Sequence, residues 1–96
     1  MIRHVVLFKW KAESTAEQRA AAIAELRTLP DQIEAVRSFV VGENVGDPDN
    51  HELAVIAEFD DIESFRAYSD HPAHLDVAIK TIGPILEQRA RIQTEL

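Results

Sequence analysis

No cysteine occurs among the 96 residues of the chain, and only three residues are glycine. Without cysteine the protein can form no disulfide bond and has no thiolate for catalysis. This is typical of proteins from reducing compartments, so we expect a cytoplasmic location. There is no Gly-rich phosphate-binding loop and no recognisable Ser/His/Asp set. We therefore expect no cofactor.

Long hydrophobic runs and an excess of positive charge are also missing. The apolar runs extend over only a few residues, so we expect no membrane span, and the N-terminus lacks the apolar stretch of a signal peptide. The formal net charge is −7. Because nucleic acids and anionic membranes attract clustered Lys and Arg, neither is an expected partner. The composition, with 46% hydrophobic residues, is that of one small globular domain over residues 1–96.

Four segments have the apolar pattern of strands: residues 2–11, 37–45, 52–60 and 89–95. Ser14 and Glu17 have the spacing of a capping box, which predicts a helix from Thr15 that ends at Pro30. Three further features predict a second helical region in two parts: Asp60 and Glu63 at the same spacing, Pro72 in the middle, and Gly83-Pro84 at the end. Its expected apolar stripes are Ile62, Phe65 and Tyr68 in the first part and Leu75, Ala78, Ile79 and Ile82 in the second.

This order of elements, β-α-β-β-α-β, predicts an α+β, ferredoxin-like fold with a four-stranded antiparallel sheet and helices on one face. The first and third strands are nevertheless apolar on both faces. Helices can cover only one face, so the other, which carries Val5, Leu7, Ala54 and Ile56, is expected to pack against a second copy. The predicted partner is the protein itself, in a sheet-to-sheet homodimer that forms an α/β barrel.

The segment from Tyr68 to His74 is the strongest candidate for chemistry. Tyr68, His71 and His74 follow one another at steps of three, which places a phenol and two imidazoles close together. We expect Tyr68 to point towards the sheet and His71 to lie at the end of a helix, where the helix dipole favours a protonated ring. His74, at the start of the next helix, is expected to be neutral and able to act as a base.

His4, Val6 and Phe8 share one face of the first strand, which we expect the helices to cover. Together with Tyr68 and His74 they could line an apolar pocket with a few polar groups. The alternative is structural, because a buried tyrosine or histidine is often a core residue with satisfied hydrogen bonds. The histidines lack the spacing of zinc ligands, and residues 46–51 lack the ordered ligands of a calcium loop, so no metal site is expected.

The chain resembles the Dabb family, the stress-responsive dimeric α/β-barrel domains. Three segments carry the resemblance: residues 2–11, residues 53–59, and Tyr68-Ser69-Asp70-His71-Pro72-Ala73-His74, which matches the family signature Y-x-x-H-P-x-H. It covers nearly the whole chain and implies a ferredoxin-like fold that dimerises through its sheets.

The resemblance also implies a type of chemistry. A plant polyketide cyclase of the family closes a linear chain by an aldol reaction without a cofactor, and its catalytic tyrosine and histidine correspond to Tyr68 and His74. His4 corresponds to a pocket histidine. Leu53 takes the place of a further pocket histidine on the third strand of that enzyme. Ile23 lies in the first helix, where the enzyme has large aromatic residues.

The leading hypothesis is thus a homodimer that binds a small apolar or aromatic molecule through His4, Val6, Phe8, Ile23, Leu53 and His71, with Tyr68 and His74 as an acid–base pair. One alternative is a non-enzymatic binding or stress-response module with a structural Tyr–His network. Another is a cofactor-free monooxygenase with the same type of barrel.

Overall fold

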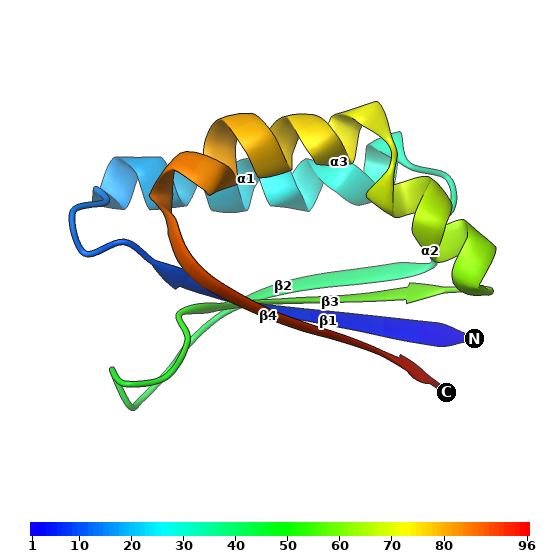
Figure 1. Cartoon of the computed structure of the whole chain (residues 1–96), viewed down its shortest axis with the longest axis horizontal. Helices are drawn as coiled ribbons and strands as arrows, with labels where there is room; N and C mark the ends of the chain where they lie inside the picture. The colour runs from blue at the N-terminus through cyan, green and yellow to red at the C-terminus, as the bar shows by residue number, and fades with distance from the viewer.

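The computed structural model describes residues 1–96 and consists of one sheet with helices on one face (Figure 1). Its strands are β1 (Ile2–Trp10), β2 (Ser38–Glu43), β3 (Leu53–Phe59) and β4 (Leu86–Glu95), in the spatial order β2-β3-β1-β4. Every neighbouring pair is antiparallel. The predicted ferredoxin-like fold is confirmed.

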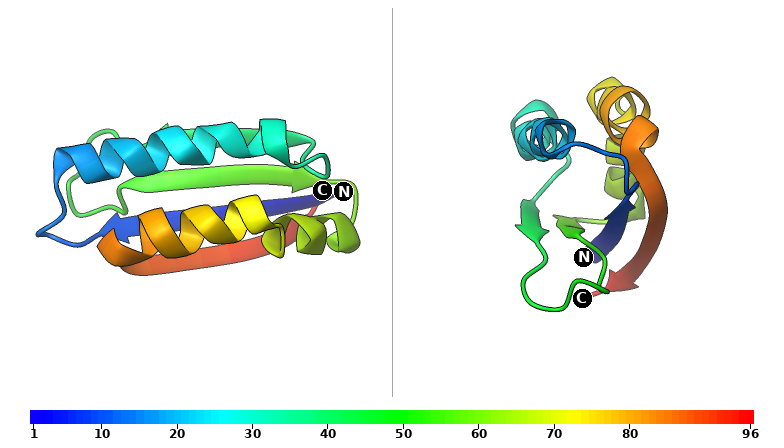
Figure 2. Two further views of the ribbon diagram at one scale, coloured as in Figure 1. Left: turned by 90° about the horizontal axis from the view of Figure 1, so that it is seen from above. Right: turned by 90° about the vertical axis from the view of Figure 1, so that its left-hand side faces the viewer.

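Two rows of helix lie side by side and cover the sheet (Figure 2). The first row is α1 (Ala16–Gln32). The second runs through α2 (Ile62–Ser69), α3 (Pro72–Asp76), the π-helical segment η1 (Val77–Ile82) and the 3₁₀ turn η2 (Gly83–Ile85), and it lies on the side of β1 and β4. None of the helices combines the length and apolar character that crossing a membrane requires.

The start of α1 differs from the prediction by one residue. Thr15, not Ser14, is the N-cap: its hydroxyl accepts from the Gln18 backbone N–H at 3.1 Å, and the Gln18 side chain accepts from the Thr15 N–H at 2.9 Å. Ser14 instead donates to the Lys11 carbonyl. The capping box is therefore Thr15–Gln18, because the turn at Lys11 already uses the Ser14 hydroxyl.

The end of α1 also differs, because Pro30 does not stop the helix. Pro30 lies in the last turn, and α1 continues to Gln32. Because proline has no backbone N–H, the helix lacks one hydrogen bond at this position. The Ile33 N–H still bonds to the Leu29 carbonyl and closes the helix. The second helix is capped by Asp61 rather than by Asp60, since the Asp61 carboxylate accepts from the Ser64 N–H.

The predicted apolar stripe of the second helical region is partly wrong. Leu75 and Ile79 are 43% and 70% exposed, and Ile62 is 40% exposed. Ile82 is buried as predicted, but the other buried position is Val77, five residues before it in η1. A π-helical turn places residues five apart on one face, so the pattern expected of an α-helix does not apply here.

The hydrophobic core lies between the sheet and the helices. Phe59, Leu29, Leu53 and Val55 are its largest fully buried side chains. Alternate residues of β1 belong to this layer, namely Val6, Phe8 and Trp10, together with the buried His4. The face of β1 towards the helices is therefore apolar except for one imidazole, and this sets the position of the site described below.

The opposite face of the sheet has two apolar rows without a covering layer. One row runs across all four strands through Val40, Ile56, Val5 and Ile92, and the next through Gly42, Ala54, Leu7 and Ala90. Val40 and Ile92 are 55% and 58% exposed. Contiguous apolar residues on an open sheet face are typical of an interaction surface.

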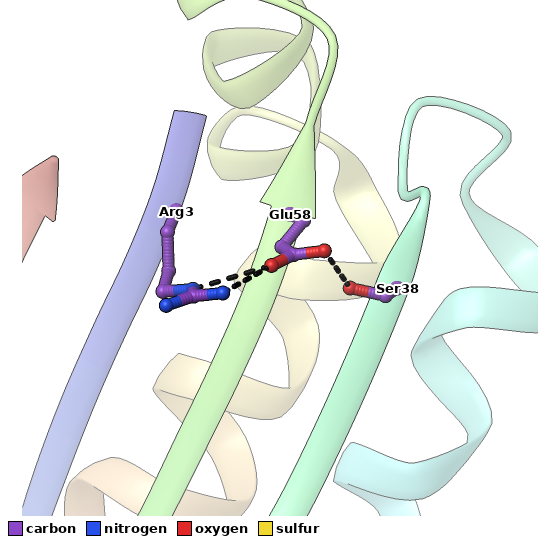
Figure 3. Close-up of polar contacts among 3 residues, drawn as sticks. All are labelled: Arg3, Ser38 and Glu58. Carbon is purple, nitrogen blue, oxygen red and sulfur yellow. Dashed lines mark hydrogen bonds and ion pairs between the residues drawn. The ribbon is translucent and has the colours of Figure 1, made fainter. Parts of the chain in front are cut away.

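A polar cluster borders these rows (Figure 3). The Arg3 guanidinium donates to the Glu58 carboxylate at 2.8 and 3.2 Å, and the Ser38 hydroxyl donates to its other oxygen at 2.9 Å. These contacts lower the pKa of the Glu58 carboxyl, chiefly through the Arg3 hydrogen bonds. The outer face thus has an apolar centre and a polar end, as protein–protein interfaces do.

Candidate functional site

A cavity of about 320 Å³ lies between the second helical row and strands β1 and β4. Sixteen residues line it, ten of them hydrophobic. The lining residues with polar atoms that bear on chemistry are His4, Tyr68, His74, Arg89 and Arg91. A concave, mostly apolar site with a few convergent polar groups is typical of small-molecule sites, and this volume lies at the lower end of their range.

The π-helical segment shapes one wall of this cavity. Val77, Ala78, Ile82 and Gly83 all contribute to the lining. The Gly83 N–H bonds to the Ala78 carbonyl five residues back, and a Cβ on Gly83 would lie only 3.1 Å from that oxygen. Glycine therefore allows this close approach and the wide turn that accompanies it. Single π-helical turns are frequent at functional sites.

Tyr68, in the last turn of α2, is only 3% exposed. Its hydroxyl makes no hydrogen bond within the chain. Every fully buried side-chain nitrogen or oxygen does have a partner, so the Tyr68 hydroxyl is not fully buried. The hydroxyl must therefore be reachable, and the cavity is the space that Tyr68 borders. Burial raises the pKa of this phenol, so it remains protonated at neutral pH and can donate a hydrogen bond to a ligand.

His74, on α3, packs against Tyr68 with ring centroids 4.5 Å apart and the ring planes tilted by 47°. Its Nδ1 lies 2.9 Å from the Ser69 carbonyl oxygen. Because a carbonyl oxygen can only accept, Nδ1 carries the proton and Nε2 keeps a free lone pair. Burial lowers the pKa of the imidazole, against the raising effect of the Ser69 bond, so the ring is neutral at pH 7.

His4 comes from β1 and completes the group. It is 5% exposed, and its ring lies 4.7 Å from Phe65 and 6.5 Å from Tyr68 between centroids. Its Nδ1 is 2.6 Å from the Gln93 side-chain nitrogen, which can only donate, so the His4 proton is on Nε2. Burial, followed by the charges of His74 and Arg91, lowers the pKa of His4 to about 4.

The lowered pKa of His4 makes stability depend on pH. The unfolded ring titrates at 6.5 and the folded ring at about 4, so only the unfolded state takes up a proton between these values. Stability is thus fully present above pH 6.5 and is lost as the pH falls towards 4. Between pH 7 and pH 5 we expect His4 to account for a loss of about 2 kcal/mol per protomer.

Urea unfolding at fixed protein concentration measures this loss. Because His74 and the carboxylates titrate as well, the quantity to compare is the difference between wild type and His4→Gln. The variant should lose about 2 kcal/mol less over the same pH interval. An identical pH dependence in both proteins would show that the His4 ring is not desolvated.

The structure brings together five of the residues that the sequence singled out: Tyr68, His74, His4, Val6 and Phe8 all line the cavity. Ile23, Leu53 and His71 do not. Ile23 and Leu53 are buried in the core. Leu26, one turn further along α1, and Val55, two residues further along β3, line the cavity in their place.

His71 is a helix cap. Its Nδ1 accepts from the Ala73 backbone N–H at 3.0 Å and so closes the start of α3. The expected protonated ring is therefore wrong, since an accepting Nδ1 carries no proton. The sequence placed His71 at the end of one helix, whereas Pro72 at the first position of α3 makes His71 the N-cap of that helix.

Strand β4 contributes two cavity residues that were not predicted from the sequence. Arg89 and Arg91 line the cavity from this strand, opposite Phe8 and Val6 of β1. Strand alternation places both arginines on one face, but only the pairing of β4 with β1 shows that this face is the one towards the helices. Ser69 was also missed, although its carbonyl orients His74. No group of three or more acidic or histidine side chains could hold a metal ion.

The family model described as Dabb, Stress responsive A/B Barrel Domain, matches residues 2–95. An uncharacterized protein of Streptomyces coelicolor is 36% identical over 77 residues, which cover 77% of this chain and 79% of that protein.

Solved structures share the fold. A dimeric ferredoxin-like protein of unknown function from Thermobifida fusca is 35% identical, with a TM-score of 0.89 over 99% of this chain and 90% of that one. A hydroxynitrile lyase from Passiflora edulis is 20% identical, with a TM-score of 0.84 over 97% of this chain and 90% of that one. At 20% identity, the similarity to the hydroxynitrile lyase shows a shared fold and nothing more.

Proposed function

The chain belongs to the Dabb family of stress-responsive A/B barrel domains, and from that premise we propose that it is a homodimer that binds a small, largely apolar molecule in the Tyr68–His74 cavity and moves a proton on it. No cofactor is needed for this chemistry, because the site's own side chains supply both the base and the hydrogen-bond donors.

One observation carries the proposal: three neutral polar groups around one cavity have complementary proton positions. His74 presents a lone pair on Nε2, while Tyr68 presents an O–H and His4 an N–H on Nε2. A carbonyl compound in the cavity can therefore be deprotonated next to its carbonyl by His74. Its developing enolate oxygen is stabilised by hydrogen bonds from Tyr68 or His4, as in other sites with preorganised donors.

The competing structural role explains less of the geometry. A purely structural Tyr–His network would use its polar atoms to join the helices. Nδ1 of His74 does so through Ser69, but Nε2 of His74 and the Tyr68 hydroxyl have no partner in the chain. One protein of the same fold is a hydroxynitrile lyase, so the fold can carry a lyase activity, although fold alone does not transfer a substrate.

The homodimer is proposed from the outer face of the sheet. Its apolar rows through Val5 and Leu7 have no covering layer in a single chain, and similar solved structures are described as dimeric. In a sheet-to-sheet dimer these rows would be buried on both copies. The cavity lies on the helix-covered side, so each protomer would keep its own site.

Binding of β-tetralone tests the ligand part of the proposal. This small bicyclic ketone has an acidic C–H next to its carbonyl. Titration followed by ¹⁵N–¹H NMR should shift the imidazole signals of His4 and His74 and leave the amides of Val40 and Ile92, on the outer face, unchanged. Ala78→Phe, which fills the cavity, should abolish the shifts. Saturable shifts confined to the outer face, or none at all, would contradict the proposal.

A further inference from the structure

Two arginines of β4 border the cavity and have no role in the proton chemistry described above. Arg89 lies opposite Phe8 and Arg91 opposite Val6 in the antiparallel β1–β4 pair, so both project on the side of the sheet that faces the helices. They are solvent-exposed, and both belong to the cavity lining. Two guanidinium groups thus stand where an apolar cavity meets solvent.

Neither guanidinium is neutralised within the chain. The ion pairs of the molecule involve Arg3, Arg37 and Lys80, and the remaining arginine hydrogen bonds do not include Arg89 or Arg91. None of the sixteen lining residues is acidic, although the chain carries 17 acidic residues and a net charge of −7. The cavity border is therefore a local positive region on an acidic protein.

The positive charges of these arginines affect the pKa values of the two cavity histidines. Arg91 contributes to the lowered pKa of His4, and Arg89 contributes to that of His74, in each case after burial. The two histidines are neutral, chiefly because they are buried, and the arginines carry the only formal charges among the residues that line the cavity. A neutral, apolar ligand would make no use of this charge, whereas a ligand with one anionic end would.

We propose that Arg89 and Arg91 form an anion-binding subsite, so that the natural ligand has an apolar or aromatic body in the cavity and a carboxylate at its border. This inference rests on the proposed ligand-binding function and adds the chemical class of the ligand. The planar guanidinium group binds a carboxylate through two parallel hydrogen bonds. A carboxylate suits a small apolar cavity better than a phosphate, because a single charge costs less to remove from water.

A pair of matched probes tests the inference: β-naphthoate and its neutral isostere β-naphthamide, with affinities measured by isothermal titration calorimetry at low ionic strength. Wild type should bind the carboxylate at least about tenfold more tightly, the gain typical of hydrogen bonds to charged groups. The double variant Arg89→Gln/Arg91→Gln should lose this preference and keep its affinity for the amide. Arg27→Gln/Arg66→Gln changes the net charge equally on exposed helix positions outside the cavity and should keep the preference.

The outcomes separate this inference from the proposal on which it rests. If wild type binds both probes equally, the anion subsite is overturned and ligand binding in the cavity stands. If the control variant loses the preference as fully as the β4 variant does, the effect is one of net charge and the subsite is again overturned. If wild type binds neither probe, both the subsite and ligand binding are contradicted.

Discussion

Replacing His74 with alanine is expected to lower the protein-catalysed exchange of the acidic protons of β-tetralone by about 10²-fold or more, the usual contribution of a general base. In the proposed step a proton passes from carbon to Nε2 of His74, the resulting enolate is held by Tyr68 or His4, and a deuteron from D₂O returns by the same path. Proton NMR in D₂O measures the rate directly. Tyr68→Phe removes only one hydroxyl and should lower the rate less.

His51→Ala is the matched control, because it removes an imidazole that does not line the cavity. It should leave the exchange rate unchanged. Since His74→Ala also removes the hydrogen bond to Ser69, circular dichroism must show that the variant is folded. A folded His74→Ala protein with wild-type exchange would contradict the assignment of His74 as the base and favour the structural role.

The pH profile of the same exchange gives an independent check. Burial lowers the pKa of His74 below its ordinary value of 6.5, so the base remains unprotonated throughout the neutral range. The rate should therefore fall only below pH 6.5. If the exchange rate already begins to fall above neutrality as the pH is lowered, the base must be a different group.

Replacing Leu7 with glutamate should convert the proposed dimer into a folded monomer. Leu7 lies in the second apolar row, next to Ala54 and Ala90 on the neighbouring strands. A dimer would bury two unpaired carboxylates there, and each costs several kcal/mol. A total of about 4 kcal/mol or more raises the dissociation constant by at least roughly 10³-fold. Analytical ultracentrifugation at micromolar concentration measures this change.

Ala21→Glu provides the control for charge, because Ala21 is exposed on α1 in the helix layer. This variant should remain a dimer with the affinity of wild type. Wild type that sediments as a stable, folded monomer would contradict the dimer itself. A Leu7→Glu protein that dimerises normally would place the interface elsewhere.

Much of the fold follows from local patterns that need no tertiary information. Alternation along β1 places His4, Val6 and Phe8 on one face, because successive side chains of a strand point to opposite sides. The apolar character of both faces of β1 and β3 predicts an outer surface with no cover. The spacing from Tyr68 to His74 is short enough for one helical region to bring the two rings together.

Helix boundaries were predicted less well, since several residues compete for the same cap. Thr15 and Ser14 can both accept a hydrogen bond from the next turn, and only the contact of Ser14 with Lys11 decides between them. Likewise, the inward positions of η1 depend on a π-helical turn, which packing selects and which no local pattern indicates.

The sequence alone determined the order of elements, the composition of the two sheet faces and the presence of Tyr68, His74 and His4 on elements that face the core. Only the tertiary structure decided which neighbours complete the cavity and which atoms carry the protons. The register of β4 places Arg89 and Arg91 beside the cavity, while the Ser69 carbonyl and the Gln93 amide determine the two histidine tautomers. These are contacts between elements distant in the chain or across the break at Pro72, and strand and helix periodicity cannot encode them.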